Sequence, residues 1–328
     1  MAMRTFLVFS AVVACLAVAQ PVLAGPNDHP SDEEDRNYAG RGITMMMDGD
    51  LDSAVQVFHQ IEQKDPDSAL GFVLEADVTW WRIYYFSADL VDPDVFDVAN
   101  MPSTPYDSHF DDLDRVAIHK AEAHIRHQED VARNDLYEGY AYALRARLEG
   151  LHDRDLATAR AGKKMRTLLL QALDLDPSLT DAYLGIGIYN YFVDTLPGIV
   201  KFLSMFIGLP GGSRTEGLEQ LQRCADTGEL GRGEAKFYLA KDFTRASEKQ
   251  FEKSGRLFGE LQRDYPHNPL WPMLVGSLQF RLGKPQKGEE IYRDVYRRTT
   301  GKNSEVDKAV QRAASQALQR LHPDQEFP

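Results

Sequence analysis

The sequence predicts an all-α protein, one irregular solenoid of antiparallel helix pairs with a C-terminal capping helix. Apolar residues recur at helical spacing through most of the chain, and proline follows several of these segments at corresponding places. No segment alternates apolar and polar residues between turn signals as a strand would, and no Pro/Gly/Ser-rich linker follows residue 36. We therefore expect a single helical array over residues 37–322 and a short tail at 323–328.

Proline separates the expected helix pairs. It occurs in Asp65-Pro66, Asp176-Pro177 and Tyr265-Pro266, and more loosely in Asn268-Pro269, each time between two apolar helical patterns. Proline ends a helix because it lacks an amide donor and clashes with the preceding turn. Near these prolines, small residues allow close helix approach and aromatic residues fill the space beside them. The small residues are Gly42, Ala54, Gly187, Gly276 and Gly288; the aromatic ones are Tyr38, Phe58, Tyr183, Phe258 and Tyr292.

This set of residue types resembles the tetratricopeptide repeat (TPR), a helix pair that recurs over ~34 residues. The resemblance implies a superhelix whose first helices line a concave face. Two units depart from the pattern. Met165 follows the helix that contains Tyr137 too late, so either these helices or the loop between them must be longer than in a regular repeat. Gly217 follows Gly187 so late that an insertion must split that pair.

The end of the array has its own signal. Ser304 precedes apolar residues at helical spacing, among them Val306, Val310, Ala314 and Leu318. This pattern predicts an amphipathic helix that Ser304 caps at its N-terminus. Such a helix would cover the last repeat.

Residues 1–24 predict a secretory signal peptide. Arg4 gives a basic start, an uncharged apolar stretch follows, and Val22-Leu23-Ala24 places small residues at the cleavage positions. We expect a periplasmic or secreted chain that begins at Gly25. A lipoprotein anchored at Cys15 is the alternative, although apolar residues follow Cys15 where a polar tether is expected. The apolar stretch is short for a membrane span.

Two further features concern the exported chain. Residues 25–36 (GPNDHPSDEEDR) have the charge and proline content of a disordered lead-in. After signal removal Cys224 has no cysteine to pair with, so no intrachain disulfide can form, and its place in the repeat predicts a structural, buried thiol.

The net charge of the chain limits the kinds of partner that it can be expected to bind. The chain carries 37 Lys+Arg against 50 Asp+Glu, a formal net charge of -13. Nucleic-acid binding depends on basic residues that displace counterions, so we expect no nucleic-acid partner. Acidic charge instead favours encounter with a basic protein or peptide.

An acidic insertion covers residues 89–114, which contain eight Asp and no Lys or Arg. Clustered carboxylates raise a calcium hypothesis, but the segment lacks the glycine and terminal glutamate of a calcium loop. Asp48-Gly49-Asp50 begins like an EF-hand, yet Ser53 replaces the turn glycine and His59 replaces the bidentate glutamate. A solvated loop and an interhelix turn, respectively, explain the two segments better.

A second insertion covers residues 195–214. Residues 199–207 are nearly all apolar, too short to span a membrane, and fit either a helix packed inside the superhelix or a lipid-binding surface. The lipid alternative would use Phe202, Met205, Phe206 and Ile207. Ser213-x-x-Glu216 forms a capping box that opens the next helix and could hold an anion on backbone amides; no P-loop lysine follows.

A narrower resemblance lies in the same region. Gly185-Ile186-Gly187, Lys201-Phe202-Leu203 and Gly211-Gly212-Ser213-Arg214 make it similar to the family called tetratricopeptide repeat protein thirty-nine. That resemblance implies a role at apolar surfaces or in protein quality control. Proteins of that family act inside cells, whereas this chain has an export signal, so we do not expect this chain to share that role.

Signals for metal or catalysis are sparse. His124 and His127 have the i, i+3 spacing of a zinc pair, but no third ligand is identifiable and His124 also falls on an apolar helix line. No nucleophile elbow, dinucleotide fingerprint or kinase motif occurs, and we expect no cofactor. An α-helical enzyme without a recognisable motif remains the third function class.

We therefore expect an exported TPR-like scaffold that binds a peptide or protein on its concave face. If the first helices line that face, its residues are Leu184, Ile188 and Tyr191, with Trp80, Trp81, Tyr84 and Tyr85 on an adjacent wall. Lipid or membrane-surface binding through 199–207 is the alternative.

Overall fold

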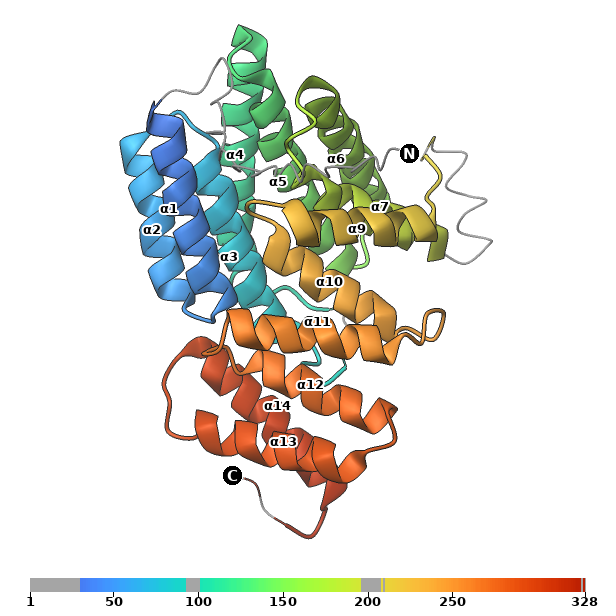
Figure 1. Ribbon diagram of the computed structural model, residues 1–328. Helices are drawn as coiled ribbons and strands as arrows, with labels where there is room; N and C mark the ends of the chain where they lie inside the picture. The colour runs from blue at the N-terminus through green and yellow to red at the C-terminus, as the bar shows by residue number, and fades with distance from the viewer. Residues whose placement is uncertain (1–29, 93–100, 196–207, 209, 326, 328) are drawn as a thin grey trace, which may run out of the picture.

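The structure is a computed structural model that describes residues 30–92, 101–195, 208, 210–325 and 327. Every regular element in this part of the chain is an α-helix, so the predicted all-α class is confirmed (Figure 1). The helices are α1 Pro30–Met47, α2 Leu51–Lys64, α3 Leu70–Ser87, α4 Asp107–His127, α5 Val131–Leu151, α6 Asp155–Leu175, α7 Ala182–Thr195, α9 Arg214–Thr227, α10 Arg232–Thr244, α11 Phe251–Asp264, α12 Leu270–Arg281, α13 Pro285–Thr299 and α14 Glu305–Leu321.

Consecutive helices pack against one another from α1 to α14, which gives the solenoid-like order of helix pairs. The prolines lie where helix ends were expected. Pro66 follows α2, Pro177 follows α6, and Pro266 follows α11, each before the next helix begins. The missing amide donor of proline thus coincides with the end of the second helix in three pairs.

The close helix contact expected at Gly42 is present. The Phe58 ring is fully buried against this glycine, and a Cβ atom on residue 42 would lie 2.2 Å from Phe58 Cε1. Only glycine lets α1 and α2 approach so closely around an aromatic ring.

The late position of Met165 now has a cause. Helices α5 and α6 each have 21 residues and are joined by only three, 152–154. The helices, rather than the loop between them, are longer than in a regular repeat.

Two predicted caps are confirmed. Ser304 Oγ accepts from the backbone amide of Asp307 at 3.0 Å, and α14 begins at the next residue, Glu305. Ser213 Oγ accepts from the amide of Glu216 at 3.3 Å at the start of α9. Each hydroxyl satisfies an amide that the helix leaves unpaired.

The array folds back on itself, because the last helix, α14, contacts α3, the third helix of the chain. The turn after α1 also meets the start of α12. The Asn268 side-chain amide donates to the Met47 carbonyl at 2.9 Å, and Trp271 Nε1 donates to the same carbonyl at 3.1 Å. In an open solenoid each repeat contacts only its neighbours, so this closure departs from a simple superhelix.

Two segments differ from the sequence expectation. Helix α1 begins at Pro30, inside the segment 25–36 that was expected to be disordered. Helix α4 begins at Asp107, so the second part of the 89–114 insertion is helical rather than a solvated loop. The Thr104 side chain forms a turn just before this start, since its hydroxyl donates to Asp107 Oδ1 at 2.5 Å and accepts from the amide of Tyr106. Residues 93–100 lie outside the described part of the chain.

Cys224 is fully buried with a free thiol, and burial raises its pKa well above the usual value.

Among the described residues, no helix combines the length and apolar character that a membrane crossing requires.

Candidate functional site

The residues predicted to line a concave face lie in the protein core. Trp80, Trp81, Tyr84 and Tyr85 on α3 are each only 3% exposed. The Trp81 ring packs between Phe237 and Trp271, with centroids at 5.4 and 6.1 Å. The middle of helix α3, residues 73–81, is buried on every face, and the helix contacts α14 in addition to α1, α2, α4 and α5. These aromatic side chains therefore form no open wall in this structure.

The residues predicted on α7 are covered as well. Leu184 and Tyr191 are 1% and 2% exposed, while Ile188 is partly buried against the same core. The Tyr191 hydroxyl lies 3.4 Å from Glu248 Oε1. Packing of α7 against α9 and α10 accounts for this burial. The residues of the lipid alternative, Phe202, Met205, Phe206 and Ile207, lie outside the described residues.

The two histidines considered for zinc have other surroundings. His124 Nδ1 lies 2.7 Å from Glu129 Oε2, and its Nε2 lies 3.1 Å from the Asp67 carbonyl, so both ring nitrogens are engaged. His127 is exposed in the last turn of α4. Within the described residues, neither belongs to a group of three metal-ligating side chains.

A buried charge cluster joins α3, α5 and α10. Arg147 donates to both carboxylate oxygens of Glu234, at 3.1 and 3.2 Å, and its Nη1 lies 4.0 Å from Asp77 Oδ1. Burial raises the pKa of Asp77 well above its usual value, and the neighbouring Glu234 raises it further, against the opposing effect of Arg147. Two charge-assisted hydrogen bonds from Arg147 to Glu234 thus join α5 to α10, with Asp77 of α3 beside them.

A small cavity adjoins this cluster. Asp77, Glu234, Asp181 and the Tyr140 ring line it, together with aliphatic residues, and its volume is about 20 Å³. That is room for about one water molecule and not for an organic substrate. Asp181 Oδ1 accepts from the amides of Leu230 and Gly231 at 3.0 and 2.8 Å. Asp181 thus ties the start of α7 to the start of α10.

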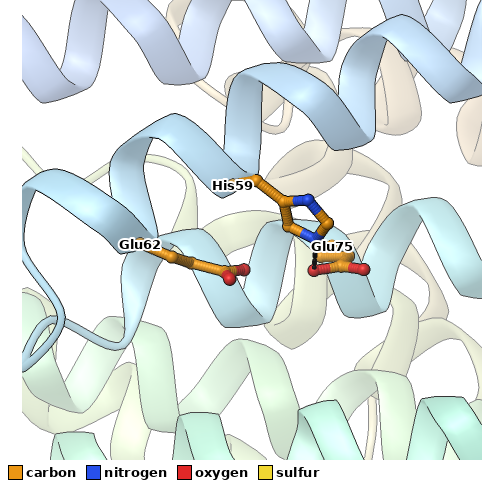
Figure 2. Close-up of side chains that lie close together, drawn as sticks. All are labelled: His59, Glu62 and Glu75. Carbon is orange, nitrogen blue, oxygen red and sulfur yellow. Dashed lines mark ion pairs between the residues drawn. The ribbon is translucent and has the colours of Figure 1, made fainter.

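A second polar cluster lies between α2, α3 and α4, near the surface. His59 Nε2 lies 2.9 Å from Glu75 Oε2, and His109 Nε2 lies 3.1 Å from Glu75 Oε1, so one carboxylate faces two imidazoles. Figure 2 shows Glu62, one turn after His59 on α2, with its carboxylate directed toward the same place. Donor atoms of His59, Glu62 and Glu75 all lie within 4.8 Å of one another.

The electrostatics of this cluster are unusual. The Glu75 side chain is only 5% exposed, whereas His59 is 48% and His109 is 58% exposed. Burial, together with the charge of Glu75 and a hydrogen bond to it, raises the pKa of Glu62 to about 8 against the lowering effect of Lys120. Two carboxyl groups at this separation disfavour each other's ionised form.

Sequence reasoning missed this cluster although a signal was present. His59 and Glu62 have the same i, i+3 spacing as His124 and His127, which puts both side chains on one face of a helix. Glu75 and His109 belong to separate helices, and no local spacing predicts their approach. In the sequence, His59 draws attention only as the residue that replaces the bidentate glutamate of an EF-hand.

The outer face of α6 is the other distinctive surface. Leu156, Arg160, Lys163, Thr167 and Leu170 follow one another by four, three, four and three residues, and all five are exposed. Leu156 is 50% and Leu170 is 39% exposed. We call these five residues the α6 stripe. Helix α6 packs on α5 and α7 through its opposite face, which carries buried residues such as Met165 and Leu169.

No protein-family model and no curated protein matches this chain. Function therefore has to be inferred from the side chains and their arrangement.

Proposed function

We propose that this chain is an exported TPR-like scaffold that binds a protein partner, and that the α6 stripe contacts that partner. The observation that supports this most directly is a helix face with regular 4–3 spacing that is exposed along its length. In the seam between two packed helices apolar residues recur at this spacing, and here Leu156 and Leu170 occupy the two end positions of the stripe. The order of helix pairs and the proline positions support the TPR-like assignment.

The apolar residues of the stripe suit a helical ligand. Leu156 and Leu170 are two heptads apart, about 21 Å along a helix of 1.5 Å per residue. A partner helix that lies along α6 would bury both leucines as anchors, and exposed leucines on a soluble surface gain free energy from such burial.

Charge defines the chemistry of the partner. Arg160 and Lys163 lie between the two leucines, on a chain whose net charge is -13. The whole-chain charge led us to expect a basic partner, but the local charge of the stripe is positive. We therefore propose an acidic, amphipathic helical segment as the ligand, because opposite charges at the rim set orientation and speed the encounter.

A protein fits this surface better than a membrane. Binding at a bilayer surface requires a continuous apolar face of considerable area. The α6 stripe offers only two leucines, separated by two basic residues and a threonine. Protein helices, by contrast, commonly dock through a few anchors at i, i+3 and i+4 positions.

Site-specific photocrosslinking tests the proposal. A photoreactive residue replaces Lys163 in the full chain, which is expressed in its native host, and crosslinked products from the exported fraction are identified by mass spectrometry. The identified partner is then purified and its affinity measured. We expect Leu156→Ser/Leu170→Ser to weaken binding at least ~10-fold, about 1.4 kcal/mol, and added salt to slow association.

Leu321→Ser is the matched control, since Leu321 is 41% exposed but lies on α14. It should leave the affinity unchanged. Equal loss of binding in both variants would refute the α6 stripe as the contact surface. Flotation with anionic vesicles, lost in Leu156→Ser/Leu170→Ser, would instead identify a lipid ligand.

The proposed export has its own test. The intact mass of the chain from its native host should correspond to a start at Gly25. An acylated N-terminus at Cys15 would support the lipoprotein alternative, and an uncleaved chain would contradict export by a cleaved signal peptide.

A further inference from the structure

We propose that His59, Glu62 and Glu75 bind one divalent transition-metal ion, with Zn²⁺ as the representative, and that His109 orients Glu75 for this task. The three ligands come from two neighbouring helices, α2 and α3, while His109 comes from α4. This site lies apart from the α6 stripe and does not depend on partner binding.

The donor distances suit a single ion. Zinc lies about 2.0–2.2 Å from imidazole nitrogen and carboxylate oxygen, so tetrahedral ligands are about 3.4 Å from one another. His59 Nε2 and Glu75 Oε2 are 2.9 Å apart, and all three donor atoms lie within 4.8 Å of one another. Rotamer adjustments of about an ångström at the long glutamate side chains therefore bring them to coordination distance.

The helix packing places the two α2 ligands. His59 and Glu62 are one turn apart and project from the same face of α2. Gly71 on α3 lets α2 approach closely, since a Cβ atom on residue 71 would lie 2.6 Å from Glu62 Cγ. The Glu62 Oε1 atom is buried without a hydrogen-bond partner among the described residues. A cation beside it would satisfy that oxygen.

His109 acts on the far side of Glu75. Its Nε2 lies 3.1 Å from Glu75 Oε1, whereas His59 faces Oε2. A hydrogen bond to the outer oxygen of a ligating carboxylate fixes the carboxylate's orientation. His109 is therefore a positioning residue and not a ligand.

The donor set selects the class of ion. Calcium and magnesium take oxygen ligands almost exclusively, whereas an imidazole with two carboxylates suits zinc and neighbouring transition metals. His59 is half exposed, so water can reach the ion and occupy a fourth position. A bound cation favours the ionised form of Glu62, so that Glu62 and Glu75 together offset the dehydration of the ion.

Lys120 is the competing cation. Its ammonium lies near Glu62, donates to the Pro66 carbonyl and sits 5.0 Å from the centroid of the Phe72 ring. A structural alternative is that Lys120 and the two histidines neutralise the carboxylates without any metal. The two arrangements differ in whether added Zn²⁺ binds at this site.

Calorimetry on the metal-stripped full chain, without a histidine tag, separates them, with Zn²⁺ as the probe and Ca²⁺ for comparison. We expect one Zn²⁺ per chain and little response to Ca²⁺. His59→Ala and Glu62→Gln should each weaken Zn²⁺ binding at least ~100-fold, and His109→Ala by about 10- to 100-fold. Circular dichroism checks that each variant is folded, and His59→Ala, at a half-exposed position, tests the site even if Glu62→Gln does not fold.

The matched control is His124→Ala/His127→Ala, which removes the other i, i+3 pair. It should leave the Zn²⁺ affinity unchanged. Absence of Zn²⁺ binding at millimolar concentration would overturn the proposal, as would an affinity that His59→Ala leaves intact. Loss of binding in His124→Ala/His127→Ala alone would move the site to α4. Cobalt substitution gives a second readout, because the visible absorption of bound Co²⁺ should disappear in His59→Ala.

Discussion

Asp114 shows how one buried carboxyl group couples stability to pH. Its side chain is 2% exposed on α4, and Arg145 Nη2 lies 2.5 Å from Oδ2. Burial raises the pKa of Asp114 from 3.8 to about 6, although Arg145 lowers it. A raised pKa in the folded state means that folding favours the protonated form. The stability from this group is thus present below pH 3.8 and is lost as the pH rises through about 6.

Asp114→Asn should remove this dependence, because an amide stays neutral. We expect the free energy of unfolding of the variant, relative to that of the native chain, to rise by about 2–3 kcal/mol between pH 4 and pH 7. Urea titrations at several pH values measure the difference, in which the contributions of other groups cancel. A difference that stays constant, or that falls with pH, would contradict the raised pKa.

Individual residues also show what sequence can and cannot predict. Gly42 and Phe58 are neighbours in a packing pattern, so their types and spacing predicted contact between helices. Ser304 predicted the start of α14, because a serine hydroxyl can accept a hydrogen bond from an amide in the first turn of the helix that follows it. Trp80 and Tyr85 were placed in a groove because their position in a repeat implies one; their burial depends on α12 and α14, which lie far away in sequence. Glu75 and His109 likewise meet only through tertiary packing.

At the scale of single helices, α14 depends on its first turn. The Ser304 hydroxyl accepts from the Asp307 amide at 3.0 Å, and this helix covers both α13 and α3. Ser304→Ala leaves that amide without a protein acceptor, and such a loss costs about 1 kcal/mol.

We therefore expect a lower free energy of unfolding for Ser304→Ala and little change for Ser304→Thr, which keeps the hydroxyl. Denaturant titration of the three proteins side by side gives the comparison. Equal destabilisation by alanine and threonine would mean that packing at residue 304, and not the cap, stabilises α14.

Element boundaries followed the sequence where local chemistry sets them. Pro66, Pro177 and Pro266 mark the helix ends because proline acts on its own turn. The start of α4 at Asp107 was missed, since charge density suggested a loop while the Thr104 side chain forms a local turn with Tyr106 and a hydrogen bond to Asp107 just before the helix. Composition describes a segment as a whole, whereas a helix start depends on one or two side chains.

At the scale of the whole molecule, Asn268 joins the start of α12 to the end of α1 and to α3, two regions far apart in the sequence. Its amide donates to the Met47 carbonyl and to the Tyr85 hydroxyl, both at 2.9 Å, and its Oδ1 accepts from the Leu270 amide at 3.0 Å. The side chain is 1% exposed, so each lost bond leaves a buried polar group unpaired.

Asn268→Ala should lower the free energy of unfolding by about 2–3 kcal/mol. Asn303→Ala, at an exposed position, should change it by less than about 0.5 kcal/mol. Hydrogen exchange adds a spatial test: protection should fall together in the turn after α1 and in the start of α12. Loss confined to α12 would show that the two ends do not depend on each other.

The contact of α14 with α3 limits how this chain can change length. An open row of helix pairs can grow or shrink by whole units, because each new pair needs only a neighbour. Here a helix pair added between α3 and α14 would move α14 out of its contact with α3. Growth by whole repeats would therefore cost the chain this contact, whereas changes in its loops and outward faces would leave it in place.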